Sequence, residues 1–228
     1  MRPMEDYVIR PIAHMRCDLP EKFGIPRQAG LVEELEGLVV FESTYRSEDA
    51  LRGLEGFSHI WLIWQFSQSL RESWSPTVRP PRLGGNARMG VFATRSPFRP
   101  NALGLSCVRL LNVERCAELG PVLRVAGADL ADGTPIYDIK PYLPYADCRP
   151  DASAGFAPEP PAALRVIFAP GTEELLPPGK RESLKGLLAQ DPRPRYQDDP
   201  MCVYGLAFAG YNVKFTVDGD VLTVLAIN

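Results

Sequence analysis

The sequence predicts a mainly β, α+β protein, built as an antiparallel β-barrel or sandwich followed by a smaller α+β domain. Short runs rich in Val, Ile, Leu and aromatic residues recur at close spacing, with almost no helical pattern between them. Proline (23 residues) and glycine (19 residues) are abundant, which indicates many turns between short elements. This combination is typical of a barrel or sandwich, and it disfavours a doubly wound sheet or a helical bundle.

Seven runs in the N-terminal two thirds of the chain are predicted strands, because each is apolar and is bounded by Gly, Pro or Asp-Gly signals. They are Tyr7–Ile12, Leu38–Phe41, Ile60–Phe66, Val91–Thr94, Leu105–Val113, Val122–Val125 and Ile136–Lys140. One short helix is predicted after Ser47, which can cap a first turn containing Glu48 and Asp49, and Gly53 ends it.

The C-terminal third begins after a proline-rich segment, since six prolines fall between Pro141 and Pro161. We therefore expect an antiparallel β domain (barrel or sandwich) over residues 7–147, a linker over 148–162 and a small α+β domain over 163–228. In that last domain the pattern predicts a helix over Lys180–Gln190 and strands over Tyr204–Phe208, Asn212–Val217 and Val221–Ile227. Asp218-Gly219 predicts a type I′ hairpin turn.

Composition excludes several classes of protein. The chain has 228 residues, 45% hydrophobic and 23% charged, as expected of a globular domain. Five cysteines without a C-x-x-C motif and only two histidines, His14 and His59, argue against a disulfide scaffold or a metal site. The most apolar stretch, Gly56–Leu70, is too short to span a membrane, and no apolar segment follows Arg2. We expect a soluble, cytoplasmic protein without metal or membrane partner.

Charge is distributed unevenly, although the formal net charge is only -3. Between Glu72 and Glu114 there is no acidic residue and no lysine, but there are six arginines: Arg79, Arg82, Arg88, Arg95, Arg99 and Arg109. Because the planar guanidinium suits phosphate and carboxylate partners, this segment predicts an anionic partner, with nucleic acid as the obvious candidate. The alternative for any single arginine is an ion pair elsewhere in the chain.

The common motifs of nucleotide-binding proteins and hydrolases are missing. No G-x-G-x-x-G follows a strand, so a Rossmann fold lacks its fingerprint. Gly85 to Gly90 matches G-x-x-x-x-G, but Val91-Phe92 follows where a P-loop needs lysine and a hydroxyl residue. No G-x-S-x-G occurs.

Three loops have stiff backbones and polar side chains, an arrangement that lowers the entropic cost of binding a ligand. The first, Phe23–Gly30, presents Arg27 and Gln28; the second covers Arg79–Asn101 with its arginines. The third runs through the turn Asp129–Pro135 and on to Lys140–Tyr145, where two tyrosines offer either stacking faces for bases or core packing.

These loops resemble one known family. The stretches PRQAG, LEGFSHIW, RPPRLGGNARMGVFATRSPFRPN and DGTPIYDIKPYLPYAD are similar to the TsaA-like (TrmO) family, S-adenosylmethionine-dependent tRNA methyltransferases. The resemblance runs from about Tyr7 to Asp147 and continues in LAQDPRPRY, Leu188 to Tyr196. It implies a small barrel, a homodimer with the cofactor near the subunit interface, and methyl transfer to N6 of N6-threonylcarbamoyladenosine beside the tRNA anticodon.

The resemblance also implies site residues. The cofactor-binding set is Pro26, Arg27, Gln28, Ser67, Gln68, Arg95, Leu105, Asp132, Gly133, Thr134 and Pro135. Ser67 stands where close relatives carry histidine. Residues of these types can bind the carboxylate, the ribose hydroxyls and the adenine edge of S-adenosylmethionine.

For the acceptor side, the expected catalytic residues are Asp138, Lys140 and Tyr142, and the expected RNA contacts are Arg82, Arg88, Arg99 and Asn101. The acceptor nitrogen must lose a proton, and Asp138, Asp132 or solvent could take it. Asp138 and Lys140 could equally form an ion pair on a strand surface. Two rival functions remain: a non-catalytic tRNA-binding or cofactor-sensing module, and a methyltransferase for another RNA adenosine or a small molecule.

Overall fold

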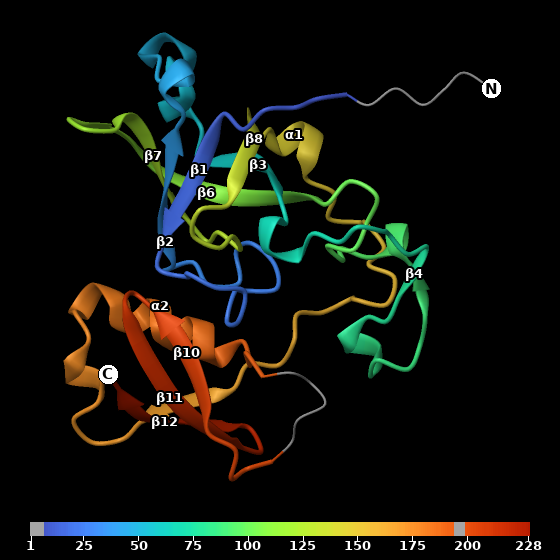
Figure 1. Cartoon of the computed structure of the whole chain (residues 1–228), viewed down its shortest axis with the longest axis vertical. Helices are drawn as coiled ribbons and strands as arrows, with labels where there is room; N and C mark the ends of the chain where they lie inside the picture. Colours follow the sequence, from blue (N-terminus) through green and yellow to red (C-terminus); the bar gives the residue numbers. More distant parts are fainter. Residues whose placement is uncertain (1–6, 194–198) are drawn as a thin grey trace.

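A computed structural model of the chain describes residues 7–193 and 199–228. The end of the family-like stretch Leu188 to Tyr196 lies outside the described residues. The described residues form two packed units joined by an extended segment (Figure 1). None of the helices that the structure describes is long and apolar enough to cross a membrane.

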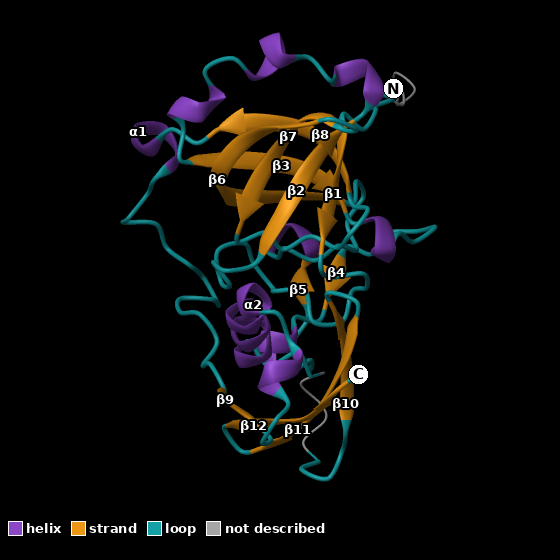
Figure 2. Ribbon diagram, turned by 90° about the vertical axis from the view of Figure 1, so that its left-hand side faces the viewer, coloured by secondary structure: helices purple, strands orange, loops and turns teal. Residues whose placement is uncertain are grey.

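The N-terminal unit is a closed ring of six antiparallel strands in the order β1-β2-β7-β6-β3-β8, a small barrel (Figure 2). The strands are β1 (Ala13–Cys17), β2 (Glu36–Phe41), β3 (His59–Gln65), β6 (Leu103–Cys116), β7 (Gly120–Ala126) and β8 (Pro135–Pro141). The prediction of a mainly β fold with a small C-terminal sheet is confirmed. Closing the ring leaves no free strand edge within it.

The interior of the ring is filled by every second residue of each strand, as the alternation of a strand requires. Along β3, Ile60, Leu62 and Trp64 are buried, whereas the residues between them are only half-buried. Trp64 lies opposite Gly104 of β6. A Cβ atom on Gly104 would come within 2.3 Å of the Trp64 ring, so the bare backbone there makes room for the indole.

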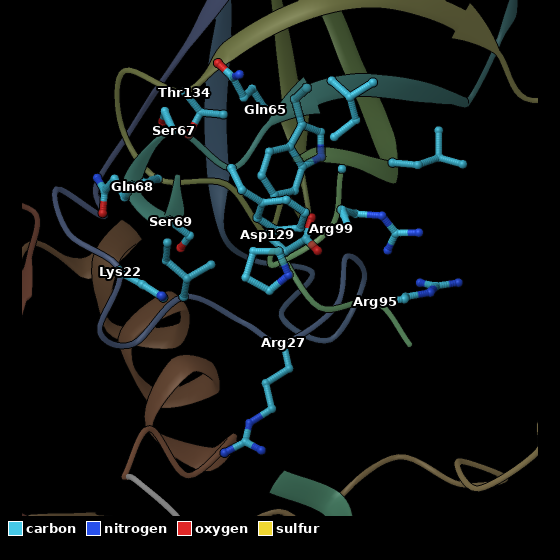
Figure 3. Close-up of a pocket in the computed structure, with 18 of the residues that line it drawn as sticks. Lys22, Arg27, Gln65, Ser67, Gln68, Ser69, Arg95, Arg99, Asp129 and Thr134 are labelled. Atoms are coloured by element: carbon cyan, nitrogen blue, oxygen red, sulfur yellow. The ribbon is translucent and has the colours of Figure 1, made fainter. Parts of the chain in front are cut away.

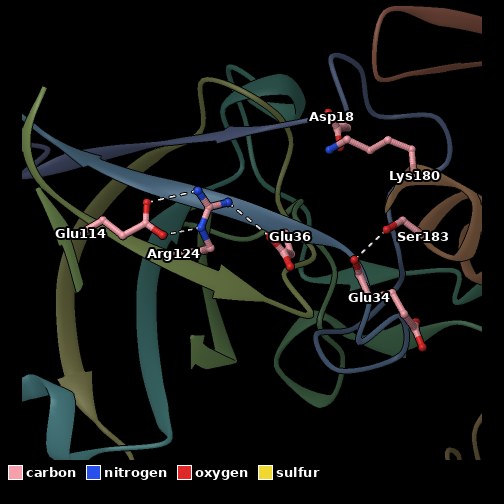
Figure 4. Close-up of polar contacts among 7 residues, drawn as sticks. All are labelled: Asp18, Glu34, Glu36, Glu114, Arg124, Lys180 and Ser183. Carbon is pink, nitrogen blue, oxygen red and sulfur yellow. Dashed lines mark hydrogen bonds and ion pairs between the residues drawn. The ribbon is translucent and has the colours of Figure 1, made fainter. Parts of the chain in front are cut away.

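One arginine ties three strands together on the outside of the ring (Figure 4). Arg124 of β7 donates two hydrogen bonds to the carboxylate of Glu114, at 2.5 and 3.1 Å, and a third to Glu36 at 3.3 Å. The bond from Arg124 lowers the pKa of Glu114 below its usual value. The hydrogen bonds from this one guanidinium link β7 to both β6 and β2 and hold the three strands in register.

Short 3-10 turns and small hairpins occupy the connections. The 3-10 turns cover Ser43–Tyr45, Glu48–Leu51, Leu54–Gly56, Ser67–Ser69, Pro81–Leu83, Val91–Ala93 and Glu173–Leu175. A two-residue pair of strands, β4 (Thr77–Val78) and β5 (Met89–Gly90), stiffens the arginine-rich loop, and α1 (Pro144–Asp147) follows β8.

Three local predictions were wrong. Tyr7–Ile12 contains no strand and its first residues are exposed; β1 begins at Ala13, where alternate side chains enter the ring. Val91–Thr94 contains a 3-10 turn, because only Val91 is buried there and Phe92 is 73% exposed. The helix after Ser47 is a single 3-10 turn over Glu48–Leu51, and the Ser47 side chain does not cap it.

The C-terminal unit packs α2 (Pro178–Ala189) on a four-stranded sheet of order β10-β11-β12-β9. Its strands are β9 (Arg165–Phe168), β10 (Tyr204–Phe208), β11 (Tyr211–Asp218) and β12 (Val221–Ile227). The helix and the last three strands match the predicted ones closely. β9, which pairs parallel to β12, was missed. Of the two residues between β11 and β12, only Gly219 has positive φ, so the turn has the type II′ pattern and not type I′.

The two units share a hydrophobic core. Leu19, Val32 and Leu35, from the loop between β1 and β2, are buried among Leu184, Leu187 and residues of the C-terminal sheet. Ser183 of α2 donates a hydrogen bond to the Glu34 carbonyl at 2.6 Å, and Lys180 forms an ion pair with Asp18 (Figure 4). The C-terminal unit therefore holds the loop that carries Pro26, Arg27 and Gln28.

Candidate active site

A cavity of about 990 Å³ opens at one end of the ring. Its walls come from the loop before β2, the ends of β3 and β6, the loop after β5 and the segment before β8 (Figure 3). Apolar side chains of Trp64, Phe66 and Phe92 provide much of its surface. The size and the mixed lining are typical of a site for a small organic ligand.

Most of the predicted cofactor-binding residues line this cavity. They are Pro26, Arg27, Gln28, Ser67, Gln68, Arg95, Leu105 and Thr134, and two predicted RNA contacts, Arg99 and Asn101, line it as well. These residues come from four separate stretches of the chain. The fold thus brings together in one place the segments that the sequence singled out.

Asp132, Gly133 and Pro135 do not line the cavity, although they flank Thr134, which does. Their turn is tied to β1: Asp132 accepts a hydrogen bond from the Cys17 N–H at 2.9 Å, and the Gly133 N–H donates to the Met15 carbonyl at 2.8 Å. In this chain the turn fixes the position of Thr134 at the wall.

Arg95 and Gln28 join two of the walls, because the Arg95 guanidinium donates a hydrogen bond to the Gln28 side-chain oxygen. The loop that carries Gln28 is also held by a backbone bond from the Gly30 N–H to the Gly127 carbonyl at 2.8 Å. Arg27 points away from the ring toward α2 (Figure 3). It also borders a second, smaller hollow against residues 187–193.

The predicted catalytic residues lie outside the cavity, on the outer face of β8 and just beyond it. Lys140 and Asp138 form an ion pair at 2.9 Å; the Lys140 side chain is exposed and that of Asp138 is half-buried. The Tyr142 ring packs on Trp61, with ring centroids 5.9 Å apart, and Trp61 lines the cavity. These three residues therefore form a surface next to the cavity, and Trp61 lies between Tyr142 and the cavity.

Arg82 and Arg88 lie on the arginine-rich loop, away from the cavity walls. Arg82 donates a hydrogen bond to the Glu159 carbonyl of the connecting segment, and Arg88 donates to the Thr77 hydroxyl at 3.3 Å. Arg95 and Arg99, by contrast, line the cavity and extend toward the same side in Figure 3. The predicted arginine cluster is thus divided between the cavity and a loop beside it.

Sequence reasoning missed a buried polar group in the cavity wall. Asp129 lines the cavity and accepts a hydrogen bond from the Ser106 hydroxyl, which in turn accepts one from the Trp64 indole N–H at 2.8 Å. Burial raises the pKa of the Asp129 carboxyl above its usual value, although the Ser106 bond and the nearby charge of Arg95 oppose this. The signal was present in VAGADLA, where one acid stands within an apolar run.

Groups of His, Cys, Asp or Glu that could hold a metal ion are not found among residues 7–193 and 199–228. The charged side chains that line the cavity, within the same part of the chain, are four cations and one carboxylate: Lys22, Arg27, Arg95, Arg99 and Asp129. The cavity is therefore electropositive and suits a ligand that carries a carboxylate.

This fold and this cavity define a β-ring protein with a cavity of the size of a small-ligand site beside an arginine-rich loop. The chain belongs to the tRNA-methyltransferase O (TrmO) family: the family's N-terminal domain matches residues 14–148, and its C-terminal domain matches residues 161–228. The resemblance read from the sequence is thus confirmed.

Similar proteins cover the whole chain. A tRNA (adenine(37)-N6)-methyltransferase of Escherichia coli is 44% identical over 233 residues, which cover 98% of this chain and 99% of that protein. A putative S-adenosylmethionine-dependent methyltransferase of Pseudomonas aeruginosa, RcsF, is 42% identical over 87% of each chain. The crystal structure of TrmO from P. aeruginosa superposes with a TM-score of 0.82 at 33% identity, covering 100% of this chain and 99% of that one.

Proposed function

We propose that this protein transfers a methyl group from S-adenosylmethionine to N6 of the adenosine at position 37 of tRNA. The observation that carries the proposal is the match over nearly the full length to an E. coli enzyme of that name, together with the cationic cavity formed by the family's conspicuous loops. The finer proposal is that the acceptor is N6-threonylcarbamoyladenosine, whose carboxylate suits the arginines at the cavity.

The cavity fits S-adenosylmethionine in size and in chemistry. Its volume of about 990 Å³ lies at the upper end of the usual range for ligand sites, which leaves room for an acceptor base beside the cofactor. Arg95 can bind the carboxylate of the cofactor, and the aromatic side chains can pack on its adenine ring. Gln28 and Gln68 can form hydrogen bonds with the polar groups of the cofactor. When bound, S-adenosylmethionine supplies an electrophilic methyl group on a sulfonium.

The contribution of the protein to this reaction is chiefly positioning, because an in-line displacement at a methyl group depends on alignment. The rigid walls fix one reactant against the other. We assign residues 7–147 to cofactor binding and chemistry, residues 148–162 to a linker and residues 163–228 to holding the first loop. Asp132, Gly133 and Pro135 would act through the placement of Thr134.

On the acceptor side, Arg82, Arg88, Arg99 and Asn101 are proposed to contact tRNA phosphates or the threonyl carboxylate. Tyr142 would stack on a base of the anticodon loop, as single-stranded RNA is commonly read, with Asp138 and Lys140 beside it. The cytoplasm is the location that such a substrate implies. We also propose a homodimer whose interface lies near the cavity, where Leu105 and Phe92 leave apolar surface exposed.

The test is incubation of the purified chain with S-adenosylmethionine and tRNA that carries or lacks the threonylcarbamoyl group, followed by mass spectrometry of the nucleosides. We expect methylation of the modified adenosine only. If the chain bound both ligands but formed no product, it would be a non-catalytic binding module. If unmodified tRNA were methylated, the substrate would be another adenosine. Sedimentation analysis tests the dimer.

A further inference from the structure

The cavity wall contains one carboxylate among the described residues, that of Asp129, and it faces the same cavity as Arg95 and Arg99 (Figure 3). A half-buried carboxylate has lost part of its hydration, so its position must be maintained by specific hydrogen bonds. The bonds in the structure fix the position of Asp129 and determine which neighbouring groups donate to it.

The hydrogen bonds around Asp129 have a determined direction. The Trp64 indole nitrogen can only donate, so in its 2.8 Å contact the Ser106 oxygen is the acceptor. The single Ser106 proton is then donated to Asp129 Oδ1. Backbone hydrogen bonds with Ala29 and with its own N–H also favour the ionised form of the carboxyl. Because an ionised carboxylate has about four acceptor sites on its two oxygens, these three bonds leave capacity to receive a proton from a ligand.

We propose that Asp129 is the general base of the methyl transfer, taking the N6 proton of the acceptor adenosine on its carboxylate. This inference rests on the proposed function. As the new bond between N6 and the methyl carbon forms and the bond between that carbon and the sulfonium sulfur breaks, Asp129 accepts the N6 proton. The products are the N6-methylated nucleoside, S-adenosylhomocysteine and a neutral Asp129 carboxyl, which afterwards releases its proton to solvent.

The two carboxylates considered from the sequence are occupied elsewhere. Asp132 accepts the Cys17 N–H and does not line the cavity. Asp138 is paired with Lys140 on the outer face of the ring and also accepts the Ile139 N–H at 2.9 Å. Asp129 alone among these three carboxylates lines the cavity.

The surroundings of Asp129 also suit a base. Burial raises its pKa, which makes the carboxylate a stronger proton acceptor, while Arg95, in the loop after β5, opposes the rise and keeps the ionised form accessible. The other charged groups on the walls that surround it are Lys22, Arg27 and Arg99, all cationic. The rate should therefore fall toward acidic pH as Asp129 becomes protonated.

The test compares the wild-type protein with Asp129→Asn, which keeps the shape and removes the base. We expect kcat to fall at least about 100-fold, as for loss of a general base, and the acidic limb of the pH–rate profile to disappear. Calorimetric binding of S-adenosylhomocysteine should be unchanged. The matched control is Asp49→Asn, an exposed carboxylate paired with Arg52, which should keep the wild-type rate.

The alternative role for Asp129 is to bind the ribose hydroxyls of the cofactor. In that case Asp129→Asn would weaken S-adenosylhomocysteine binding while saturating cofactor restored kcat, and the proposal would be overturned. A wild-type rate for Asp129→Asn would overturn it while the proposed function stood. No methylated nucleoside from the wild-type protein would overturn the proposed function and this inference with it.

Ser106→Ala provides a second variant, in which Ser106 acts as a positioning residue. Loss of its hydrogen bond removes a contact that favours the ionised carboxylate, so the acidic limb should move to higher pH. A purely structural effect would lower the melting temperature without moving the limb. If the folded Ser106→Ala protein kept the acidic limb of its pH–rate profile at the wild-type pH, this would contradict the proposal that Ser106 donates its proton to Asp129.

Discussion

Arg95 joins two walls of the cavity and is the natural partner of a ligand carboxylate, because it extends from one loop and hydrogen-bonds to Gln28 of another. We predict that Arg95→Ala weakens the binding of S-adenosylhomocysteine about 10- to 100-fold, the usual effect of losing a hydrogen bond to a charged group. Titration calorimetry measures it. Arg115→Ala, which removes an exposed arginine paired with Glu48, is the control and should leave the affinity unchanged.

Cys17 illustrates how burial sets the reactivity of a side chain. Desolvation raises the pKa of its thiol to about 11 from an ordinary 9.0, and its sulfur donates to the Leu130 carbonyl at 3.4 Å. At pH 8 its thiolate fraction is therefore about 100-fold below that of an ordinary thiol, and reactivity rises only as pH approaches 11. We predict that iodoacetamide modifies exposed Cys148 long before Cys17 in the native protein. Peptide mass spectrometry over time measures the order, and equal rates would contradict it.

At the residue scale, the sequence was informative where a side chain is distinctive in its loop. Arg27, Gln28 and Arg95 were identified from stiff, polar stretches and from the family resemblance, and the fold places them at one cavity. Asp129 was missed because its importance depends on Ser106 and Trp64, which are distant in sequence and become its neighbours only when β3 and β6 pair.

At the scale of the element, the pairing of β3 with β6 places Trp64 over a residue with no side chain. A methyl group on Gly104 would meet the indole at 2.3 to 2.8 Å, and this ring cannot simply rotate away because it is packed in the core and on Phe66. We predict that Gly104→Ala destabilises the protein by about 1–3 kcal/mol, as overpacked core variants do. Urea unfolding measures this loss, and Gly90→Ala, at an open position, is the control.

The arginine-rich loop is the element expected to contact tRNA phosphates. If Arg88 contacts a phosphate, Arg88→Ala should lower tRNA affinity and reduce the slope of log affinity against log salt by about 1. The Arg115→Ala protein should keep the wild-type slope. Filter binding at several salt concentrations measures both slopes. If the Arg88→Ala slope equalled the wild-type slope, Arg88 would not contact a phosphate, and its contact with Thr77 would be purely structural.

Elements were predictable where burial alternates along a strand. β2, β3, β6, β7 and β8 were located because their apolar residues meet one core. Tyr7–Ile12 has the same residue types but lies outside the ring, so composition alone gave a false strand. β9 was missed because only half of its residues are even partly buried, and its parallel partner β12 lies more than fifty residues away.

At the scale of the whole molecule, the two units are linked through the loop that carries the first cavity wall. Leu19, Val32 and Leu35 belong to the core of the C-terminal unit, although they precede β2 in the chain. The C-terminal unit loses part of its core when these residues are removed, whereas the core inside the ring consists of residues 12–139 alone. We therefore expect a coupling between the C-terminal helix and the cavity through this loop.

Gly186 of α2 tests this coupling, because a Cβ atom there would lie 2.8 Å from a methyl group of Val32. We predict that Gly186→Ala pushes the loop away, is less stable than Gly179→Ala by about 1–3 kcal/mol, and binds S-adenosylhomocysteine several-fold more weakly. Gly179→Ala is the control, since it makes the same substitution in the first turn of the same helix at an open position. Titration calorimetry at a temperature where both variants are fully folded separates the effect on binding from the effect on stability. Weaker binding by Gly186→Ala would show that the C-terminal unit positions Arg27 and Gln28. Unchanged binding would limit the role of the C-terminal unit to stability.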